Sequence, residues 1–373
     1  SSIFISFNFI FSTINRIILF KDGLQSASLH DCSNSSWTSV CYIFHMTQNH
    51  HKFCIAPMMK KTDKHFRFMA RQFTKNSMLY TEMIHSNAIL KGDVDKLLKF
   101  DRSEHPVGLQ LGGSDPKSLA QAAIIGQEFG YDEINLNVGC PSKKVKSGNF
   151  GVFLMKNVEL LGSCVNEVKK NINIPFTIKC RIGVDDFEGE DYLESFLSTI
   201  SDYDISTFII HARKAISGLD TKRNRSIPPL NYDLVYKMKD RFPNLKIIIN
   251  GGIEEIENVK KQLNFVDGVM LGRKIYSDPA FLLQIDKEVY GNNTNLEFSK
   301  GMQNYMAYIL TLKNKKDVNR AVTHLLQIIR KLSHTKEIRR RLLDNVKNTS
   351  IDLEDVFNCF KEDLDQKAHL QIH

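Results

Sequence analysis

The sequence contains no C-x-x-C pair, and its seven cysteines are scattered and odd in number. A disulfide framework or a zinc site needs paired or closely spaced cysteines, so neither is expected and no metal site is predicted. This cysteine usage favours a reducing compartment. No G-x-G-x-x-G follows the first predicted strand, so the fingerprint of a dinucleotide-binding doubly wound sheet is missing as well.

Charge is nearly missing from residues 1–20, where Arg16 is the only charged side chain among apolar and aromatic residues. A secretory or organelle-targeting segment is one interpretation; a membrane span is the weaker one, because Ser, Asn and Thr interrupt the apolar run. Residues 21–52 are rich in Ser, Asn and His without a clear period, which is typical of a poorly packed segment. We therefore interpret residues 1–52 as a leader, and expect a cytoplasmic or organellar protein without stable membrane association.

The rest of the composition is that of a globular protein with a sizeable core: 373 residues, 42% hydrophobic, with a formal net charge of +8. From residue 53, short apolar or β-branched runs alternate with helix-like segments. Among these segments are Lys117–Phe129, which Ser114 or Asp115 would cap, and Asn157–Asn171. The apolar runs predict eight strands: Cys54–Met59, Met78–Met83, Val107–Gly112, Glu133–Val138, Phe176–Ile182, Thr207–Ala212, Leu245–Asn250 and Gly268–Gly272.

Strands that alternate with helices pair in parallel, and eight such units close naturally into a barrel. We therefore predict a (β/α)8 TIM barrel over residues 53–292. An open doubly wound sheet is the alternative, and the missing glycine fingerprint argues against it.

After Tyr290 the pattern changes to helices without strands, which predicts a small all-helical C-terminal domain over residues 293–365. Residues 301–350 hold eleven Lys or Arg against three acidic residues. A solvated helix face and a surface for nucleic-acid phosphates both account for this excess. The predicted helices are Leu296–Leu312, Asp317–Leu332, Thr335–Asn345 and Asp352–Asp363.

Polar side chains recur at the ends of the predicted strands, where a parallel barrel places its active site. Buried Lys, Arg and His need partners, so their gathering at one end of the barrel favours a functional site over core packing. Asn250-Gly251-Gly252 and Gly272-Arg273, after the last two strands, have the composition of a phosphate site. The other candidates are Pro57, Met58, Gln110, Asn137, Cys140, Lys179, Arg181, His211 and Arg213.

A collinear series of stretches resembles the successive motifs of tRNA-dihydrouridine synthases. The resemblance extends from about residue 53 to residue 350 and is nearest to the branch that acts on D-loop uridines 20 and 20a. LNVGCPS, and HARKA followed by NRSIPPL, are its most specific parts. The other stretches are APMMKKTDKHFRFMARQ, MLYTEM, LQLGGSDP, IKCRIGVDD, INGGI and DGVMLGRKIY.

The resemblance implies FMN across the barrel mouth, with NADPH or NADH as a transient electron donor. A cation near the flavin edge also has a physical rationale, because it stabilises the anionic reduced flavin. The implied contacts are Pro57, Met58 and Met59 to the ring, Gln110, Lys179 and His211 to its polar edge, and Asn250, Gly251, Gly252, Gly272 and Arg273 to the phosphate.

The implied reaction is the reduction of uridine to 5,6-dihydrouridine in the D-loop of tRNA, with Cys140 as general acid. Thiols have an ordinary pKa of about 8.5, so they are mostly protonated near neutral pH and can donate a proton. The target uridine has to leave its stack to enter the pocket. The implied substrate and tRNA contacts are Asn137, Arg181, Arg213, Lys222 and Arg225, with Lys336 and Arg339 in the helical domain.

Two other functions compete with this one. A dihydroorotate-dehydrogenase-like oxidoreductase would use FMN on a free pyrimidine, but a small substrate does not require the basic helical tail. A tRNA-binding chaperone without catalysis would not need Cys140, Lys179 or the Gly-Arg pair, and all are present. We expect a monomeric enzyme.

Overall fold

The computed structural model describes residues 50–142, 145, 148–291, 296–330, 332, 335–347 and 353–366. Residues 1–49 of the predicted leader lie outside these ranges, and residues 50–52 form the 3-10 helix η1 (His50–Lys52). The described residues belong to one compact unit, His50–His373. Within them, no helix has the length and apolar character that a membrane crossing requires.

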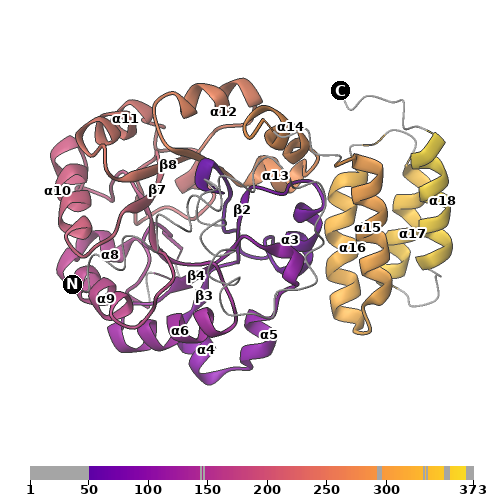
Figure 1. The fold of residues 1–373 in the computed structure, drawn as a ribbon, viewed down its shortest axis with the longest axis horizontal. Coiled ribbons are helices and arrows are strands. Elements are labelled where there is room, and N and C mark those ends of the chain that lie inside the picture. Colours follow the sequence, from indigo (N-terminus) through magenta and orange to yellow (C-terminus); the bar gives the residue numbers. More distant parts are fainter. Residues whose placement is uncertain are drawn as a thin grey trace, which may run out of the picture. The chain divides into compact units, whose positions relative to one another are not determined.

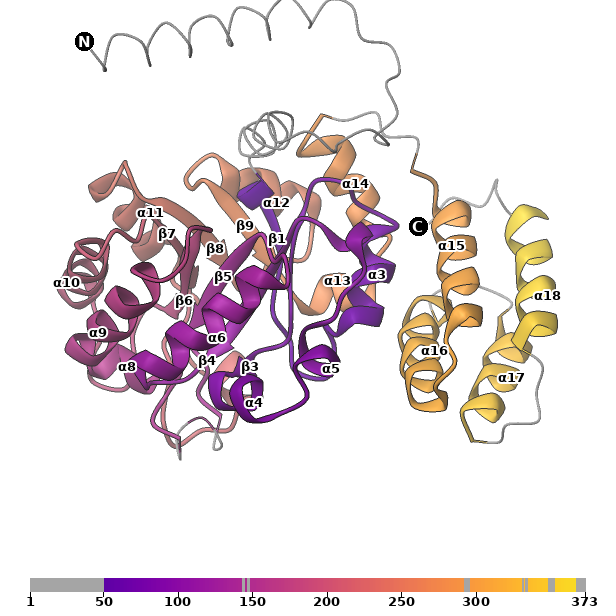
Figure 2. The ribbon, with the colours of Figure 1, turned by 60° about the horizontal axis from the view of Figure 1, so that its bottom comes forward.

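The central sheet is a closed barrel of parallel strands with helices around it (Figures 1 and 2). Neighbouring strands pair in parallel around the ring, and the pairing of β2 with β4 closes it. This confirms the predicted (β/α)8 barrel and excludes the open sheet. The barrel strands are β1 (Phe53–Ile55), β2 (Met78–Tyr80), β4 (Val107–Gly112), β5 (Glu133–Asn137), β6 (Phe176–Arg181), β7 (Thr207–His211), β8 (Lys246–Asn250) and β9 (Gly268–Leu271).

The second strand ends earlier than predicted. One strand was expected over Met78–Met83, but β2 stops at Tyr80 and a separate two-residue strand, β3 (Ile84–His85), pairs with the end of β4. The interruption occurs at Thr81, whose hydroxyl accepts the backbone N–H of Gln110 at 3.0 Å. The Thr81 hydroxyl thus takes the place of a backbone carbonyl as the acceptor for the Gln110 N–H. Regular pairing of β2 with β4 ends at this point.

The outer ring is made of helices, and several of them, including the one beginning at Pro116, start at a capping side chain. The Asp115 carboxylate accepts the Ser118 N–H at 2.8 Å, so Asp115 rather than Ser114 caps the helix that begins at Pro116. The helices are α3 (Lys64–Arg71), α4 (Ser86–Lys91), α5 (Val94–Leu98), α6 (Pro116–Glu128), α8 (Phe153–Lys156), α9 (Val158–Lys169), α10 (Glu190–Ser201), α11 (Tyr232–Arg241), α12 (Ile256–Leu263), α13 (Arg273–Ser277) and α14 (Phe281–Glu288), with 3-10 turns η2 (Arg102–Glu104) and η3 (Arg223–Arg225).

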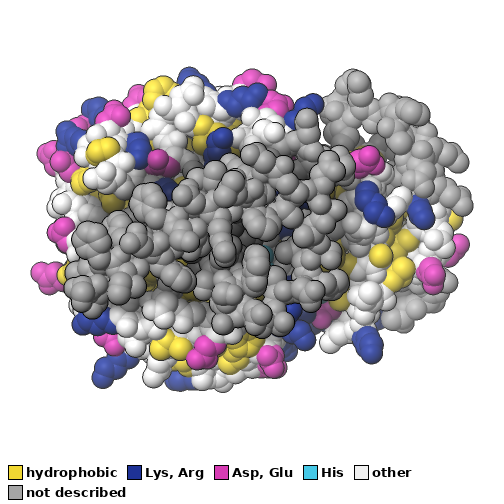
Figure 3. All heavy atoms as spheres, viewed as in Figure 1, with side chains coloured by type: hydrophobic (Ala, Val, Ile, Leu, Met, Phe, Trp, Pro, Cys, Tyr) yellow, Lys and Arg dark blue, Asp and Glu magenta, His cyan; other side chains and the backbone are white. Residues whose placement is uncertain are grey.

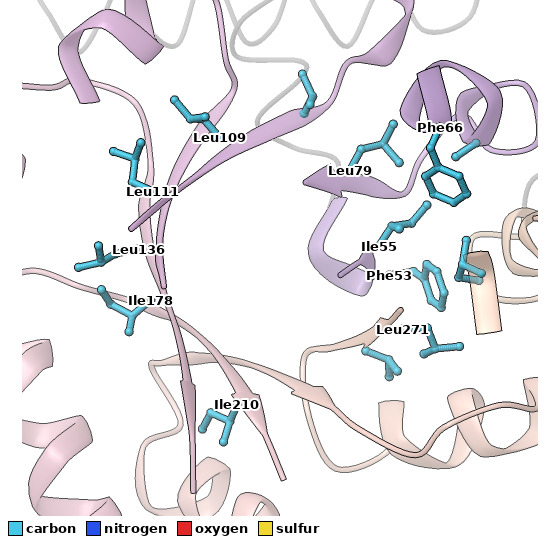
Figure 4. Close-up of a cluster of buried hydrophobic side chains, with 14 of the residues drawn as sticks. Phe53, Ile55, Phe66, Leu79, Leu109, Leu111, Leu136, Ile178, Ile210 and Leu271 are labelled. Carbon is cyan, nitrogen blue, oxygen red and sulfur yellow. The ribbon is translucent and has the colours of Figure 1, made fainter. Parts of the chain in front are cut away.

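The core has two layers, because alternate strand residues point to opposite faces of the sheet. The larger layer lies between strands and helices, where Figure 4 shows Leu109, Leu136 and Ile178 from successive strands. A smaller apolar cluster contains Cys54, Tyr80 and other residues of β1, β2, β7, β8 and β9. Three buried polar residues, Gln110, Asn135 and Thr177, lie side by side on β4, β5 and β6.

In the described ranges, four helices follow the barrel and confirm the helical C-terminal region: α15 (Phe298–Thr311), α16 (Lys315–Ile329), α17 (Lys336–Lys347) and α18 (Leu353–Gln366). Helix α16 packs on α3. Asp63, which caps α3, accepts hydrogen bonds from Arg320 and from His324 at 3.0 Å. Burial raises the pKa of Asp63, but the bonds from His324 and Arg320 outweigh it and hold this pKa well below its usual range.

Candidate active site

A cavity of about 730 Å³ is lined by residues at the carboxyl ends of the barrel strands and in the loops that follow them. This volume is typical of a site for a cofactor or a small molecule. The cavity brings together fifteen of the predicted site residues: Pro57, Met58, Met59, Asn137, Cys140, Lys179, Arg181, His211, Arg213, Arg225, Asn250, Gly251, Gly252, Gly272 and Arg273.

Four predicted site residues do not line the cavity. Gln110 is buried within β4 and bonds through both ends of its amide to Asn135 and Asn137, so its contact with a flavin stays a prediction. Lys222 precedes η3 and is exposed. Lys336 is exposed and Arg339 is half-buried, both on α17.

The loop that carries Cys140 is held by side chains on both sides. Asn137, the last residue of β5, accepts the backbone N–H of Gly139 at 3.2 Å and of Cys140 at 2.9 Å. From the other side, Arg181 donates from Nε to the Gly139 carbonyl at 2.8 Å. The half-buried thiol of Cys140 therefore has a defined position at the cavity wall.

Lys179 is the cation at the centre of the site. Its Nζ donates to Oδ1 of Asn250 at 3.1 Å, and Asn250 is oriented in turn by donating to the Met270 carbonyl at 2.7 Å. Burial, followed by the charge of Arg181, lowers the pKa of Lys179 to about 8. At neutral pH Lys179 is therefore mostly charged.

His211, at the end of β7, is uncharged at neutral pH. Burial holds its pKa well below the usual range, and the charges of Arg181 and Lys179 act in the same direction. A neutral imidazole can both donate and accept a hydrogen bond.

Arg181 and Arg213 differ in how many of their N–H groups have hydrogen-bond partners. Arg181 is 4% exposed and donates to carbonyls of Gly139, Arg213, Lys214 and Asn224, so its main contacts are structural. Arg213 donates through Nη1 to the Pro228 carbonyl, but its buried Nε has no hydrogen-bond partner in the described part of the chain. A buried donor of this kind indicates a place for an acceptor from outside the chain.

Directly after β8, Gly251 and Gly252 form a turn in which the backbone lies close to neighbouring side chains. Gly251 and Gly252 have φ values of +120° and +70°, a region that other residues rarely adopt. A Cβ at Gly251 would lie 2.7 Å from the ring of His211, and a Cβ at Gly252 would collide with Leu230. Only glycine therefore keeps both this turn and the position of His211.

Several residues that line the cavity were not predicted from the sequence. Met83, His85 and Phe150 line one wall, where the rings of His85 and Phe150 meet edge to face at 4.8 Å. His85 ends β3, so the strand-end rule would have found it if the break after Tyr80 had been recognised. Lys61 lies with its Nζ 4.3 Å from the Tyr276 ring centre, and burial, with Arg225 and Arg273, lowers its pKa.

The charge of the surface is mixed on the face that Figure 3 presents, where Lys and Arg alternate with acidic side chains around the barrel. No cluster of three or more potential metal-ligating His, Cys, Asp or Glu side chains occurs in the described ranges. The cavity, by contrast, brings Lys179, Arg181, Arg213 and Arg273 to one place. Its chemistry is that of an anion site with a thiol on its wall.

Comparison with known proteins agrees with this chemistry. The family model described as dihydrouridine synthase (Dus) matches residues 54–365. A tRNA-dihydrouridine(20/20a) synthase of Synechocystis sp. is 45% identical over 295 residues, covering 78% of this chain and 88% of that protein. The proteins of the same name from Haemophilus ducreyi and Escherichia coli (strain K12) are 44% and 42% identical, covering 79% and 81% of this chain and 91% and 88% of their own lengths. This chain belongs to the dihydrouridine synthase family.

Proposed function

We propose that this protein reduces uridine to 5,6-dihydrouridine at positions 20 and 20a of tRNA, with FMN as cofactor and Cys140 as proton donor. The observation that carries the proposal is the placement of the Cys140 thiol, the Lys179 cation and a glycine-arginine anion site around a single cavity. The relatives support the choice of substrate, because each is named as a synthase of dihydrouridine in tRNA.

The residues of the cavity fit FMN. The unpartnered Nε of Arg213 and the positive-φ glycines after β8 favour an anionic group that approaches the backbone closely. Asn250, Gly251, Gly252, Gly272 and Arg273 would hold the phosphate. Pro57, Met58 and Met59 would border the ring, with Lys179 and His211 at its polar edge. When bound, FMN supplies the hydride for uracil C6, after accepting it from NADPH or NADH.

The reduction needs a proton at uracil C5 in addition to the hydride at C6. The thiol of Cys140 can give this proton, because its loop is fixed at the cavity wall by Asn137 and Arg181. Asn137 gives one amide N–H to Gln110, which leaves its second N–H to donate to a uracil carbonyl. Lys179 would stabilise negative charge that develops during the transfer.

The helical region would bind the tRNA body while the target uridine enters the cavity. The double substitution Lys336→Glu and Arg339→Glu, on α17, should weaken tRNA binding about tenfold and lower its salt dependence by roughly two counterions. Filter binding of tRNA at several salt concentrations measures both quantities. FMN content should not change, because neither residue lines the cavity.

Lys260→Glu with Lys261→Glu is the matched control, since it makes the same change in charge on exposed residues of α12. Equal loss of affinity in both double variants would show that only net charge matters and would remove the assignment of α17 as a tRNA contact.

A second prediction concerns the glycines that would hold the flavin. Gly251→Ala should lower FMN affinity at least about tenfold, because the new Cβ pushes His211 away and strains a positive-φ turn. Gly189→Ala is the control: its φ is +96°, yet a Cβ there meets nothing within 4 Å. Fluorescence titration of the FMN-free protein with FMN compares the two. Equal affinities in both variants would place the flavin elsewhere.

A further inference from the structure

Strand β5 carries a row of polar side chains through the inside of the barrel. Glu133, Asn135 and Asn137 alternate along the strand and therefore share one face. The registers place Gln110 of β4 and Thr177 of β6 on either side of Asn135. All but Asn137 are at most 2% exposed, so this row crosses the barrel below the cavity.

The upper half of the row is a directed chain of hydrogen bonds. The N–H of Cys140 donates to Oδ1 of Asn137 at 2.9 Å. Nδ2 of Asn137 donates to Oε1 of Gln110 at 3.0 Å. Nε2 of Gln110 donates to Oδ1 of Asn135 at 2.7 Å. Each amide accepts at its oxygen and donates from its nitrogen, always towards the floor of the barrel.

The lower half continues in the same direction and ends on a carboxylate. Nδ2 of Asn135 donates to Oγ1 of Thr177 at 2.8 Å, and this hydroxyl donates to Oε1 of Glu133 at 2.5 Å. The hydroxyl of Tyr80 donates to the same oxygen at 2.7 Å, and Nε2 of His51 lies 2.6 Å from Oε2. Three donor groups therefore converge on Glu133.

The direction of the chain follows from this end point. Thr177 has one hydroxyl proton, and because Glu133 accepts it, the Thr177 oxygen can only accept from Asn135. The amide of Asn135 must then present its oxygen to Gln110, and Gln110 must present its oxygen to Asn137. The oxygen of Asn137 is left for the backbone N–H groups of the loop that carries Cys140.

We propose that Glu133 is a positioning residue: through the interior chain it orients Asn137 and so fixes the loop of Cys140. The proposal rests on the proposed function, in which Cys140 gives its proton to uracil. Without the chain, Asn137 is oriented only by the N–H groups of the loop that it holds. The amide and the loop can then turn together, which moves the thiol.

Thr177→Val tests the proposal, because it removes the relay hydroxyl at nearly constant volume from a residue that does not line the cavity. We expect kcat for tRNA reduction to fall about tenfold, with KM for tRNA unchanged. In FMN-free protein, the rate at which iodoacetamide alkylates Cys140, followed by peptide mass spectrometry, should change at least about threefold. Thr177→Ser keeps donor and acceptor and should restore both values.

Thr207→Val is the matched control, a buried threonine of β7 outside the chain. The two variants are compared at matched thermal stability. If Thr177→Val has the same alkylation rate and the same kcat as Thr207→Val, the proposal is overturned. If Thr177→Val does not fold, Asn135→Leu breaks the chain at the next link and should give the same two changes. Failure of the proposed function can be told apart from failure of this proposal. If only the proposed function is wrong, the wild-type protein forms no dihydrouridine, but Thr177→Val still changes the alkylation rate of Cys140.

Discussion

Cys140→Ala should lower the rate of dihydrouridine formation by about 10²–10⁴-fold, the usual contribution of a positioned acid. In the proposed reaction the thiol, on a loop held by Asn137 and Arg181, is the proton source, and alanine has no proton to give. FMN and tRNA should still bind, because the backbone contacts of the loop do not involve the sulfur. Cys140→Ser should be nearly as inactive, since an alcohol is a far weaker acid than a thiol.

Dihydrouridine in a purified tRNA transcript, measured by mass spectrometry after single-turnover reaction with reduced enzyme, gives the rate directly. Cys359→Ala is the control, because Cys359 is an exposed cysteine on α18 and does not line the cavity. A Cys140→Ala variant with the activity of wild type would require another proton donor and would remove Cys140 from the proposed reaction.

Lys179→Met should lower the same rate about 100-fold, which is typical for loss of one preorganised electrostatic contact. Methionine keeps the length and burial of the side chain but removes both its charge and its bond to Asn250. Lys287→Met, on the exposed face of α14, makes the same chemical change away from the cavity. Comparable rates in the Lys179 variant and in wild type would show that this cation has no part in the reaction.

The pKa of Lys179 adds a pH dependence to this prediction. Burial and Arg181 lower that pKa to about 8, so the side chain is charged below about pH 8 and loses its proton as the pH rises through this value. Activity should therefore decline on the alkaline side with a midpoint near pH 8, measured from about pH 6.5 to about pH 9.5. Lys179→Arg keeps its charge throughout this range and should move the decline to higher pH. An unchanged midpoint in Lys179→Arg would assign the decline to another group.

The strand and helix order could be predicted from the sequence because period and capping residues are local signals. Cys140 and Lys179 could be predicted as well, since Cys140 follows the end of β5 and Lys179 lies near the end of β6. The carboxyl ends of the strands of a parallel barrel all meet at one face. The resemblance of the motifs then assigned chemistry to them.

Other parts of the site could not be predicted because they depend on which side chains meet across the barrel. Both faces of a barrel strand are buried, so alternation does not show that Asn135 will meet Gln110 and Thr177. The resemblance implied a substrate contact for Arg181, and that stays a prediction. Its hydrogen bonds to carbonyls of loops distant in sequence could not be foreseen. The break of β2 at Thr81 depends on a hydroxyl that bonds to a neighbouring strand, which no local pattern reveals.

The docking of α16 on α3 has a consequence for building hybrid enzymes. Asp63 starts α3 only a few residues after Met58 and Met59 at the cavity, and the same carboxylate holds Arg320 and His324 of α16. The helical region and the cavity thus share one anchor and are not interchangeable modules. A chimera that takes α15 to α18 from a relative would need to import α3 with them, or the transplanted helices would lose their packing partner next to the cavity.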